Sequence, residues 1–403
     1  MRRAAAEPRG RVAIVAGEAS GDMLGAALIR ALRARFPHLE FTGIAGPKMI
    51  AEGARTLFPL EKLSVRGYVE AIRHVPEIWS IRRKLGRFLL DDPPDVFIGV
   101  DAPDFNLGIE SRLRRAGIRT VHYVSPSLWA WRPERIHAIK RAVDHMLVVF
   151  PFEEPIYRNA GVTVTYVGHP LADAMPRVPD RDDARAQLRL AAAAPAIALL
   201  PGSRVSELEW HADLMIETAR RVAASHPGVR FFVPLATRET HAYFESRIYA
   251  REAREVAIST LFGHARLALQ AADVALVASG TATLEAALAR CPMVITYRVP
   301  DLTYRIMKRK ALLPYVGLPN ILCGEFVVPE LLQGEATPEH LSQALSNWLD
   351  AKHARARLQE RFERLHASLA CDHDARVADA LAPYLGAIAD SPAAYPRAAD
   401  RAA

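Results

Sequence analysis

Short apolar runs alternate with longer segments of helical periodicity along the first half of the chain. The runs fall at residues 11–17, 41–46, 95–100, 120–124 and 145–150. Runs of this length bounded by turn residues predict buried strands, and helical crossovers between them keep the strands parallel. The first crossover is predicted as a glycine turn at residues 18–25 followed by a helix over 26–36. This half is therefore expected to be one parallel sheet wrapped by helices.

The same pattern begins again after a proline-containing stretch at residues 167–180. Strands are predicted at 196–200, 229–234, 257–262, 274–277 and 292–297, and helices at 208–223, 338–349, 351–369 and 374–385. We therefore expect two α/β domains, at residues 1–172 and 173–350. Residues 351–388 are expected to form helices that pack on the first domain or on a partner chain. Residues 389–403, rich in Ala, Pro and Arg, are expected to be disordered.

The composition indicates what kind of partner the chain binds and in which compartment it works. The 403 residues carry a net charge of +7 that comes mainly from Arg, which suits phosphate or anionic-surface partners. No zinc spacing, aromatic RNA-binding motif or long basic run points to nucleic acid. Three well-separated cysteines predict neither a disulfide framework nor a cysteine metal site. With no signal-peptide core and no apolar stretch long enough to span a bilayer, we expect a cytoplasmic enzyme.

The turn after the predicted strand at 274–277 has the chemistry of an anion site. Gly280 allows a tight turn, and Ser279, Thr281 and Thr283 place hydroxyls where the first N–H groups of a helix lack partners. A phosphate fits such a turn, and Glu285, one helical turn further on, suits a sugar hydroxyl. Taken alone, this stretch favours an ordinary turn with capping hydroxyls over an anion site.

A second strand-to-helix turn follows residues 196–200. Ser203 and Arg204 come directly after Gly202, where the planar, permanently charged guanidinium of Arg204 can stabilise a diphosphate. A surface arginine is the alternative, and the neighbouring glycine turn argues against it. Asn320, in a short polar break at residues 318–324, is a weaker candidate for binding a phosphate or a sugar.

Three loops of the first domain are expected to share one crevice, because ligands bind at the carboxyl ends of parallel strands. They are residues 17–22, 101–106 and 125–131. Asp101 directly follows a strand and is our candidate base for an incoming hydroxyl, with Asp104 and Glu18 as alternatives. Helix capping is the other role for these aspartates, and it is the favoured role for Asp104. Glu18, Ser20 and Asp22 are assigned to substrate binding. Trp129 and Trp131 beside Arg132 suit either an amphiphile or the core.

Residues 65–90 form an amphipathic and basic pattern that Pro76 is expected to divide. Its apolar positions follow helical spacing, with Arg82, Arg83 and Arg87 among them. Such a helix binds an anionic membrane surface or, more commonly, faces a protein core. If it binds membrane, replacing the three arginines with glutamate should reduce binding to liposomes.

Five motifs together give the chain a specific resemblance. They are residues 15–22 (VAGEASGD), 100–106 (VDAPDFN), 122–132 (HYVSPSLWAWR), 200–204 (LPGSR) and 278–285 (ASGTATLE). In combination they resemble the lipid-A-disaccharide synthases, which are inverting glycosyltransferases of GT-B architecture, and the resemblance covers residues 11 to 385. It implies two Rossmann-like, doubly wound domains that face a central cleft, with the acceptor on the first domain and the UDP-sugar on the second.

The resemblance also implies a reaction and a role for each candidate. UDP-2,3-diacylglucosamine and 2,3-diacylglucosamine 1-phosphate would give a β-1',6-linked disaccharide and UDP, without a metal or other cofactor. Asp101 would be the general base on the acceptor 6-hydroxyl, and Arg204 would stabilise the UDP leaving group. Ser203 and the turn from Gly280 to Thr283 would assist at the diphosphate. Glu285 would bind the ribose, and Asn320 would belong to the donor site.

Because both substrates carry acyl chains, the resemblance also implies peripheral association with the cytoplasmic face of the inner membrane, with residues 65–90 as the expected contact. A homodimer through the C-terminal part is compatible with the family. Two rival interpretations remain. One is a UDP-sugar 2-epimerase of the same architecture, and the other is a non-catalytic, basic, peripheral membrane-binding protein.

Overall fold

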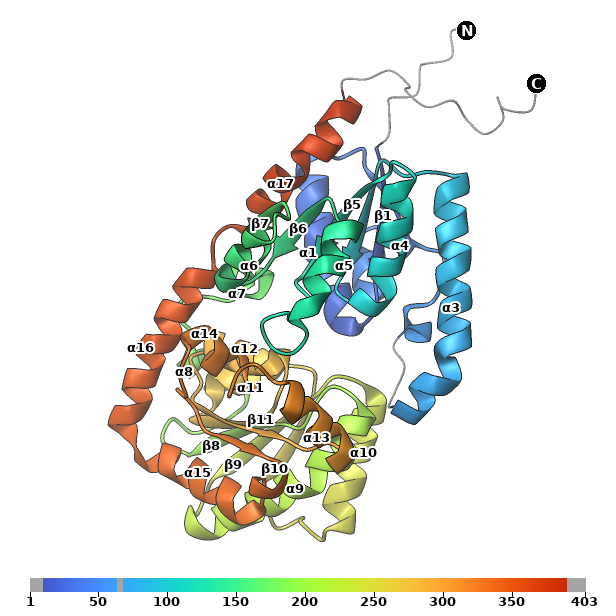
Figure 1. Cartoon of the computed structure of the whole chain (residues 1–403). Coiled ribbons are helices and arrows are strands. Elements are labelled where there is room, and N and C mark those ends of the chain that lie inside the picture. The colour runs from blue at the N-terminus through green and yellow to red at the C-terminus, as the bar shows by residue number, and fades with distance from the viewer. Residues whose placement is uncertain (1–9, 64–67, 390–403) are drawn as a thin grey trace, which may run out of the picture. The chain divides into compact units, whose positions relative to one another are not determined.

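The computed structural model describes residues 10–63 and 68–389, and the chain divides into two compact units (Figure 1). Unit 1 combines the chain up to Asp173 with the chain from Leu369 onward, and unit 2 is Ala174–Ser368. Each unit contains one parallel sheet, so the predicted α/β class with two parallel-sheet domains is confirmed.

Unit 1 has a seven-stranded sheet in the order β3-β2-β1-β4-β5-β6-β7, with every neighbouring pair parallel. Its strands are β1 (Arg11–Ala16), β2 (Glu40–Ile44), β3 (Arg55–Thr56), β4 (Val96–Val100), β5 (Arg119–Tyr123), β6 (His145–Val148) and β7 (Val164–Tyr166). Its helices are α1 (Ala19–Arg35), α2 (Pro47–Ala51), α3 (Tyr68–Asp91), α4 (Pro103–Arg115), α5 (Ile136–Ala142), α6 (Glu154–Asn159) and α17 (His373–Ala389). Helix α7 (Pro170–Ala174) leads into unit 2.

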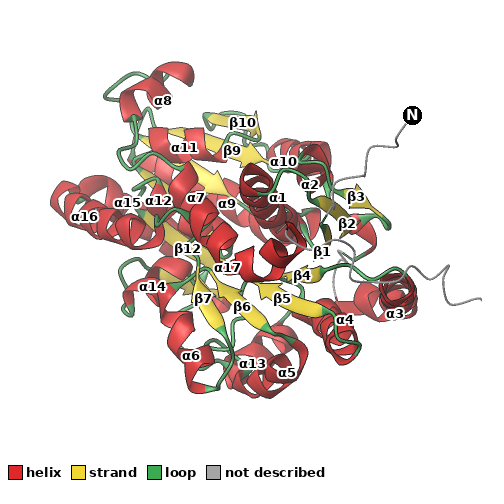
Figure 2. Ribbon diagram, turned by 90° about the horizontal axis from the view of Figure 1, so that it is seen from above, coloured by secondary structure: helices red, strands yellow, loops and turns green. Residues whose placement is uncertain are grey.

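Helices cover both faces of this sheet. Figure 2 shows β4 to β7 side by side, with α4 and α5 on one face and α1 and α17 on the other. All five residues of β4 are buried, as are residues 12–16 of β1. A strand enclosed from both sides has no solvent face, so its sequence is a continuous apolar run without alternation.

Unit 2 repeats this design with a six-stranded parallel sheet in the order β10-β9-β8-β11-β12-β13. Its strands are β8 (Ala196–Leu200), β9 (Arg230–Leu235), β10 (Ile258–Phe262), β11 (Val274–Ala278), β12 (Met293–Tyr297) and β13 (Glu330–Leu332). Its helices are α8 (Arg181–Gln187), α9 (Val205–Ser225), α10 (Arg238–Ala250), α11 (Ala265–Ala271), α12 (Thr281–Leu288), α13 (Asp301–Lys310), α14 (Leu318–Cys323), α15 (Pro338–Asp350) and α16 (Lys352–Leu369).

The last helix of the chain completes unit 1. Val377, Leu381 and Leu385 of α17 are buried, and α17 packs against α1. The hydroxyl of Tyr123, at the end of β5, lies 2.7 Å from Nε2 of His373, and both groups are buried. Unit 1 is therefore built from two segments that are separated in sequence by the whole of unit 2.

Several predicted boundaries were wrong. Helix α1 begins at Ala19, so the expected glycine turn is the first part of the helix. Gly21 and Gly25 both lie inside this helix, and a Cβ on Gly25 would lie 2.7 Å from the sulfur of Met49, so glycine lets α1 and α2 approach closely there. Pro76 lies inside the continuous α3, and the expected polar break at 318–324 is the helix α14. The expectations for residues 64–67 and 390–403 lie outside the described residues.

Candidate active site

Each sheet has one switch point, where the strand order reverses and two neighbouring loops leave the sheet in opposite directions. In unit 1 this point lies between β1 and β4, and in unit 2 it lies between β8 and β11. The four loops that leave these strands carry Glu18, Asp101, Arg204 and Ser279. The sequence candidates therefore gather at the position in each unit where this kind of fold binds ligands.

Asp101 occupies a strained position at the switch point of unit 1. Its φ is 51° and that of Ala102 is 44°, a left-handed conformation that costs free energy for residues other than glycine. The Asp101 N–H is fixed by the carbonyl of Tyr123 on β5 at 2.9 Å. A Cβ on Gly17 would lie 2.5 Å from Cβ of Ala102, so only glycine lets the loop after β1 come this close. Burial raises the pKa of Asp101, which favours its action as a base.

Neither aspartate caps α4, contrary to the expected role for Asp104. The helix begins at Pro103, and the cap residue Ala102 provides no side-chain hydrogen bond. The side chain of Asp104 is 82% exposed and pairs with Arg135 at 2.5 Å. This exposure and this partner favour Asp101 over Asp104 as the base.

A buried acid–imidazole pair lies beside Asp101. Nδ1 of His122 lies 2.7 Å from Oε1 of Glu110, and neither side chain is exposed. Burial opposes a charge on the imidazole, but the Glu110 carboxylate and the Asp101 charge together raise the pKa of His122. The charge of His122 in turn lowers the pKa of Asp101 against the effect of burial. Among the described residues, Nε2 of His122 and Oε2 of Glu110 have no hydrogen-bond partner.

Sequence reasoning missed this pair. Its only signal was a charged residue on the inner face of α4, opposite a histidine at a strand position that is otherwise apolar. Gly99 of β4 makes the room for it, because a Cβ at that position would lie 2.1 Å from Oε1 of Glu110.

The three candidates in the loop after β1 have different surroundings. Glu18 is exposed at the position that precedes α1, and Ser20 is half-buried in the first turn of that helix. Asp22 is buried, and its two carboxylate oxygens accept the N–H groups of Lys48 and Met49 at 2.9 and 3.0 Å. Asp22 therefore holds the N-terminus of α2, and its assignment to substrate binding stays a prediction.

The two tryptophans after β5 differ as well. Nε1 of Trp129 donates to the buried carboxylate of Glu153 at 2.9 Å, and burial raises the pKa of Glu153 to about 7. Trp131 is exposed, and the guanidinium of Arg132 lies 4.1 Å from its ring centre. Trp129 is therefore structural, whereas Trp131 offers an aromatic and cationic surface to solvent.

In unit 2, Arg204 directly precedes α9 and its guanidinium is half exposed. Glu207 shapes the turn, because one of its carboxylate oxygens accepts the N–H of Ser203 at 2.7 Å and that of Arg204 at 3.2 Å. Its other oxygen lies 3.3 Å from the Arg204 guanidinium. Gly202 has φ 126°, and a Cβ there would lie 2.5 Å from the same carboxylate. The glycine turn is therefore built around Glu207, a residue that sequence reasoning did not single out.

The neutral side chain of His211 supports this turn through two hydrogen bonds. Nδ1 of His211 donates to the carbonyl of Glu207 at 2.7 Å, and its Nε2 accepts the Arg298 N–H at 3.0 Å, which fixes the neutral tautomer. Burial lowers the pKa of His211 accordingly. The ring of Tyr297 stacks on His211 with 5.5 Å between ring centres. Burial raises the pKa of Tyr297, and the charges of Glu207 and Arg204 shift it in opposite directions.

The turn before α12 is a glycine turn that opens a helix, and its role as an anion site stays a prediction. Gly280 precedes the helix with φ 146°, and both Gly280 and Thr281 are exposed. Ser279 lies between β12 and the segment before α14, since its N–H donates to Thr296 and its hydroxyl donates to the carbonyl of Val316 at 3.4 Å. The exposed start of the helix leaves backbone N–H groups available to a phosphate.

Thr283 and Asn320 have internal roles. Thr283 is buried, and its hydroxyl donates to Gly280 at 2.8 Å and accepts the Leu318 N–H at 3.3 Å. The Asn320 amide donates to Val328 and Glu330 and accepts the N–H groups of Val327 and Val328, all within 3.0 Å. These four bonds use the full capacity of the amide.

Both residues can therefore serve a donor site by holding its loops, and their direct substrate contact stays a prediction. Glu285, half-buried one turn into α12, keeps the position expected for it. In residues 10–63 and 68–389, no group of three His, Cys, Asp or Glu side chains has the arrangement of a metal site.

Solved structures with the same fold define the class. The chain matches a putative UDP-N-acetylglucosamine 2-epimerase from Listeria monocytogenes with a TM-score of 0.62 and 12% identity, covering 91% of this chain and 94% of that one. It matches the calicheamicin glycosyltransferase CalG4 with a TM-score of 0.59 and 15% identity, covering 94% and 99%. Two parallel α/β domains of this kind are the GT-B fold, as the sequence predicted.

Sequence relatives define the family within that class. The pattern of the lipid-A-disaccharide synthetase family matches residues 12–381. The chain is 54% identical over 374 residues to the lipid-A-disaccharide synthase of Methylobacillus flagellatus, which covers 93% of this chain and 99% of the relative. It is 56% identical over 375 residues to that of Aromatoleum aromaticum, covering 93% and 96%. The chain belongs to this family, and it is a glycosyltransferase of lipid A biosynthesis.

Proposed function

We propose that the chain joins UDP-2,3-diacylglucosamine to 2,3-diacylglucosamine 1-phosphate, with the acceptor on unit 1 and the donor on unit 2. One observation carries the assignment of roles. Asp101 and Arg204, the two residues with the required chemistry, stand in loops at the switch points of their respective sheets.

The proposed reaction is a single displacement at the anomeric carbon of the donor. The acceptor 6-hydroxyl gives its proton to the Asp101 carboxylate while its oxygen forms the new bond to that carbon. The bond from the carbon to the diphosphate breaks, and UDP leaves with the electron pair, which inverts the configuration. A base with a raised pKa holds the transferred proton more firmly, and the burial of Asp101 supplies this property.

The departing diphosphate gains negative charge as the bond breaks, and unit 2 offers two sources of positive potential. One is the Arg204 guanidinium, which Glu207 orients through its carboxylate. The other is the exposed start of α12 at Gly280 and Thr281. Groups that are fixed before the reaction stabilise such charge without reorganisation.

The proposal is tested by supplying both lipid substrates to the purified protein and measuring the disaccharide and UDP. Asp101→Asn and Arg204→Ala should each reduce turnover by about 10²-fold or more while the far-UV circular dichroism stays unchanged. Asp104→Asn is the matched control for the base. Arg230→Ala is the control for the cation, because Arg230 is the first residue of β9 and therefore lies at the amino-terminal ends of the parallel strands, away from the loops that follow them. Near-normal rates in the two site variants would reject these roles.

The epimerase alternative follows from fold likeness alone. Incubating the protein with the UDP-sugar and no acceptor separates the two activities, since an epimerase turns over under these conditions and the proposed synthase does not. Activity without acceptor would favour the epimerase.

We also propose a peripheral association with the membrane, because both substrates are acylated. No helix within the described part of the chain has both the length and the apolar content needed to cross a bilayer. The rival interpretation, a membrane-binding protein without catalytic activity, predicts that Asp101→Asn and Arg204→Ala leave the cellular function intact.

A homodimer is a further proposal, which sedimentation velocity tests.

A further inference from the structure

Large exposed apolar side chains concentrate in one segment of unit 2. We call α13 (Asp301–Lys310) together with residues 311–316 the α13 strip. It contains Leu302 at 72% exposure, Ile306 at 44%, Met307 at 50%, Leu312 at 55% and Val316 at 42%. No residue of α13 is buried. A contiguous group of exposed apolar side chains of this kind commonly marks a surface that another body covers.

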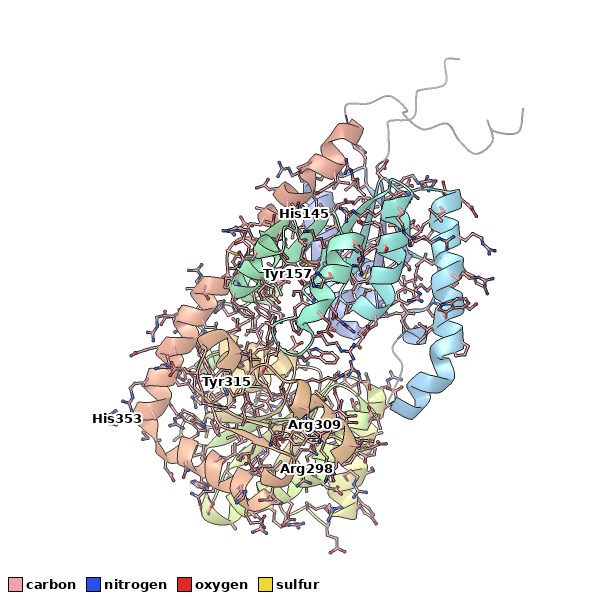
Figure 3. The ribbon with its side chains drawn as sticks, viewed as in Figure 1. His145, Tyr157, Arg298, Arg309, Tyr315 and His353 are labelled. Carbon is pink, nitrogen blue, oxygen red and sulfur yellow. The ribbon has the colours of Figure 1, made fainter. Side chains whose placement is uncertain are left out.

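The same strip is strongly basic. Arg305, Lys308, Arg309 and Lys310 lie within it, and Asp301 is its only acidic residue. The carboxylate of Asp301, at the first position of the helix, accepts a hydrogen bond from Gln333 at 3.2 Å, and with four cations against this one acid the strip has a net positive charge of three. The cations therefore remain on the exposed helix, together with the apolar side chains, and Figure 3 labels Arg309 on α13 and Tyr315 in the segment after it.

The outward face of the helix carries both kinds of residue. Thr303 and Tyr304 are the only half-buried residues of α13, so they mark the side that faces the protein. At 100° per residue, Leu302 lies on the opposite, outward side with Arg305 and Arg309 next to it. Ile306 lies at the margin of that side, whereas Met307 falls on the side of Thr303 and Tyr304. Aliphatic side chains flanked by arginine and lysine are the composition of a helix that lies in the interface of an anionic bilayer.

The strip leads directly to the proposed donor site. The carbonyl of Val316 accepts the hydroxyl of Ser279, and the N–H of Leu318, two residues further on, donates to Thr283. Glu330 fixes the same segment by accepting the N–H groups of Val316 and Gly317 at 2.9 and 2.8 Å. The end of the strip is thus held against the turn that precedes α12.

We propose that the α13 strip is a docking surface for an anionic lipid bilayer and brings the donor site of unit 2 to its acylated substrate. This inference rests on the proposed function and gives the peripheral association a location. Positive charge attracts the strip to acidic headgroups, and Leu302, Ile306 and Leu312 then enter the boundary of the acyl chains. A short helix with few apolar anchors binds reversibly, as an enzyme that must exchange its lipid substrates requires.

A second copy of this chain is a poorer occupant for the strip. A two-fold interface places the same patch on itself, so four cations would face four cations as the apolar side chains met. An anionic bilayer instead pairs the cations with acidic headgroups and covers the apolar side chains at the same time.

The described half of α3 offers less to a membrane than its sequence suggested. Ile81, Leu85 and Leu89 are buried, so the apolar stripe in this half faces the core of unit 1. Only Trp79 and Phe88 are exposed large apolar residues between positions 76 and 91, and the Arg83 guanidinium lies 5.6 Å from the Trp79 ring centre. The side chains of residues 64–75 lie outside this description.

The test is flotation of the full chain with vesicles of phosphatidylcholine alone or with an equal part of phosphatidylglycerol. The wild-type protein should float with the anionic vesicles only. A variant with Leu302→Ser, Ile306→Ser and Leu312→Ser should bind them at least about tenfold more weakly, and so should a variant with Arg305→Glu and Arg309→Glu. The matched control replaces Tyr249 and Phe262 with serine, since both are comparably exposed in unit 2 but lie outside the strip.

Turnover with detergent-dispersed substrates separates this inference from the proposed function. The strip variants should keep wild-type turnover with these substrates. If the wild-type protein formed no disaccharide, the proposed function would be rejected, and the vesicle-binding result would still test the strip. Absence of wild-type flotation would overturn the inference. Unchanged flotation of both strip variants would also overturn it. Loss of flotation in a variant with Arg82→Glu, Arg83→Glu and Arg87→Glu instead would assign the membrane contact to α3. A sedimentation coefficient that falls to that of a monomer in the serine variant would assign the strip to a second copy of the chain.

Discussion

At the scale of single residues, the pKa of the proposed base Asp101 depends on Glu110 and His122, which need not contact the substrate. The Glu110 carboxylate is hydrogen-bonded to His122, and His122 places positive charge near Asp101. Burial raises the pKa of Asp101, and the imidazolium moderates that rise so that the carboxylate remains ionised over a wider pH range. Glu110 and His122 are therefore positioning residues for the proposed reaction.

Glu110→Gln should move the acidic limb of the pH–rate profile to higher pH. Without the Glu110 carboxylate, His122 loses its proton more readily, so the pKa of Asp101 rises further and more of it is protonated at low pH. Above that limb the rate should return close to the wild-type value. Measuring kcat from acidic to alkaline pH gives the answer, and Glu110→Asp should restore part of the profile. A loss that is uniform across pH would indicate a merely structural role.

The sequence alone predicted on which loops the candidate residues lie, but it did not show which groups they contact. Asp101 and Arg204 could be located because polar residues directly after apolar strands must lie at the carboxyl edge of a sheet. Asp22 lies inside α1 and Asn320 inside α14, and the hydrogen bonds of both go to the chain itself. Whether a polar group is satisfied depends on tertiary contacts such as those of Val327 with Asn320, and no spacing in the sequence shows them.

At the scale of elements, Asn320 joins α14 to the segment that leads into β13. Asn320→Ala should destabilise the protein by about 3–5 kcal/mol, because it leaves the N–H groups of Val327 and Val328 and the carbonyl of Val328 without this partner and removes one donor from Glu330. Urea unfolding measures this, with Asn347→Ala, an exposed asparagine on α15, as the control. Unchanged stability with a raised KM for the donor would instead support direct contact with substrate.

Strands were predicted better than helix starts, and the reason is physical. A strand buried on both faces must be a continuous apolar run, which β1, β4, β8 and β11 show. The start of α1 was misplaced because glycine normally marks a turn, whereas Gly21 and Gly25 lie within the helix, and Gly25 lies where the helix packs closely on Met49. Helix α13 was not predicted at all, because its apolar residues serve no core and its pattern resembles a polar loop.

At the scale of the whole molecule, unit 1 depends on a helix from the far end of the chain. Deleting residues 370–403 removes the burial of Val377, Leu381 and Leu385, worth about 5 kcal/mol or more, which approaches the stability of a typical domain. Unit 1 should therefore lose its cooperative thermal transition while unit 2 keeps its own. Calorimetry and limited proteolysis measure this. Deleting only 390–403 should preserve both transitions, and an intact unit 1 transition after the longer deletion would refute the prediction.

This dependence was beyond the reach of sequence reasoning, which left open whether the last helices pack on the first domain or on another chain. The contact of Tyr123 with His373 spans 250 positions. Periodicity shows that a helix has an apolar face, but it does not show which of several surfaces covers that face.

The interrupted construction of unit 1 has a consequence for biosynthesis. A ribosome must translate residues 174–368 before it reaches α17, which takes roughly 10–40 s at bacterial elongation rates. During that interval the inserted unit can acquire its native state first, while the nascent N-terminal portion waits with the side of α1 that α17 will cover still open to water. The chain therefore reverses the usual N-to-C order of maturation, and a chaperone that shields apolar surfaces would act on the earlier segment rather than the later one.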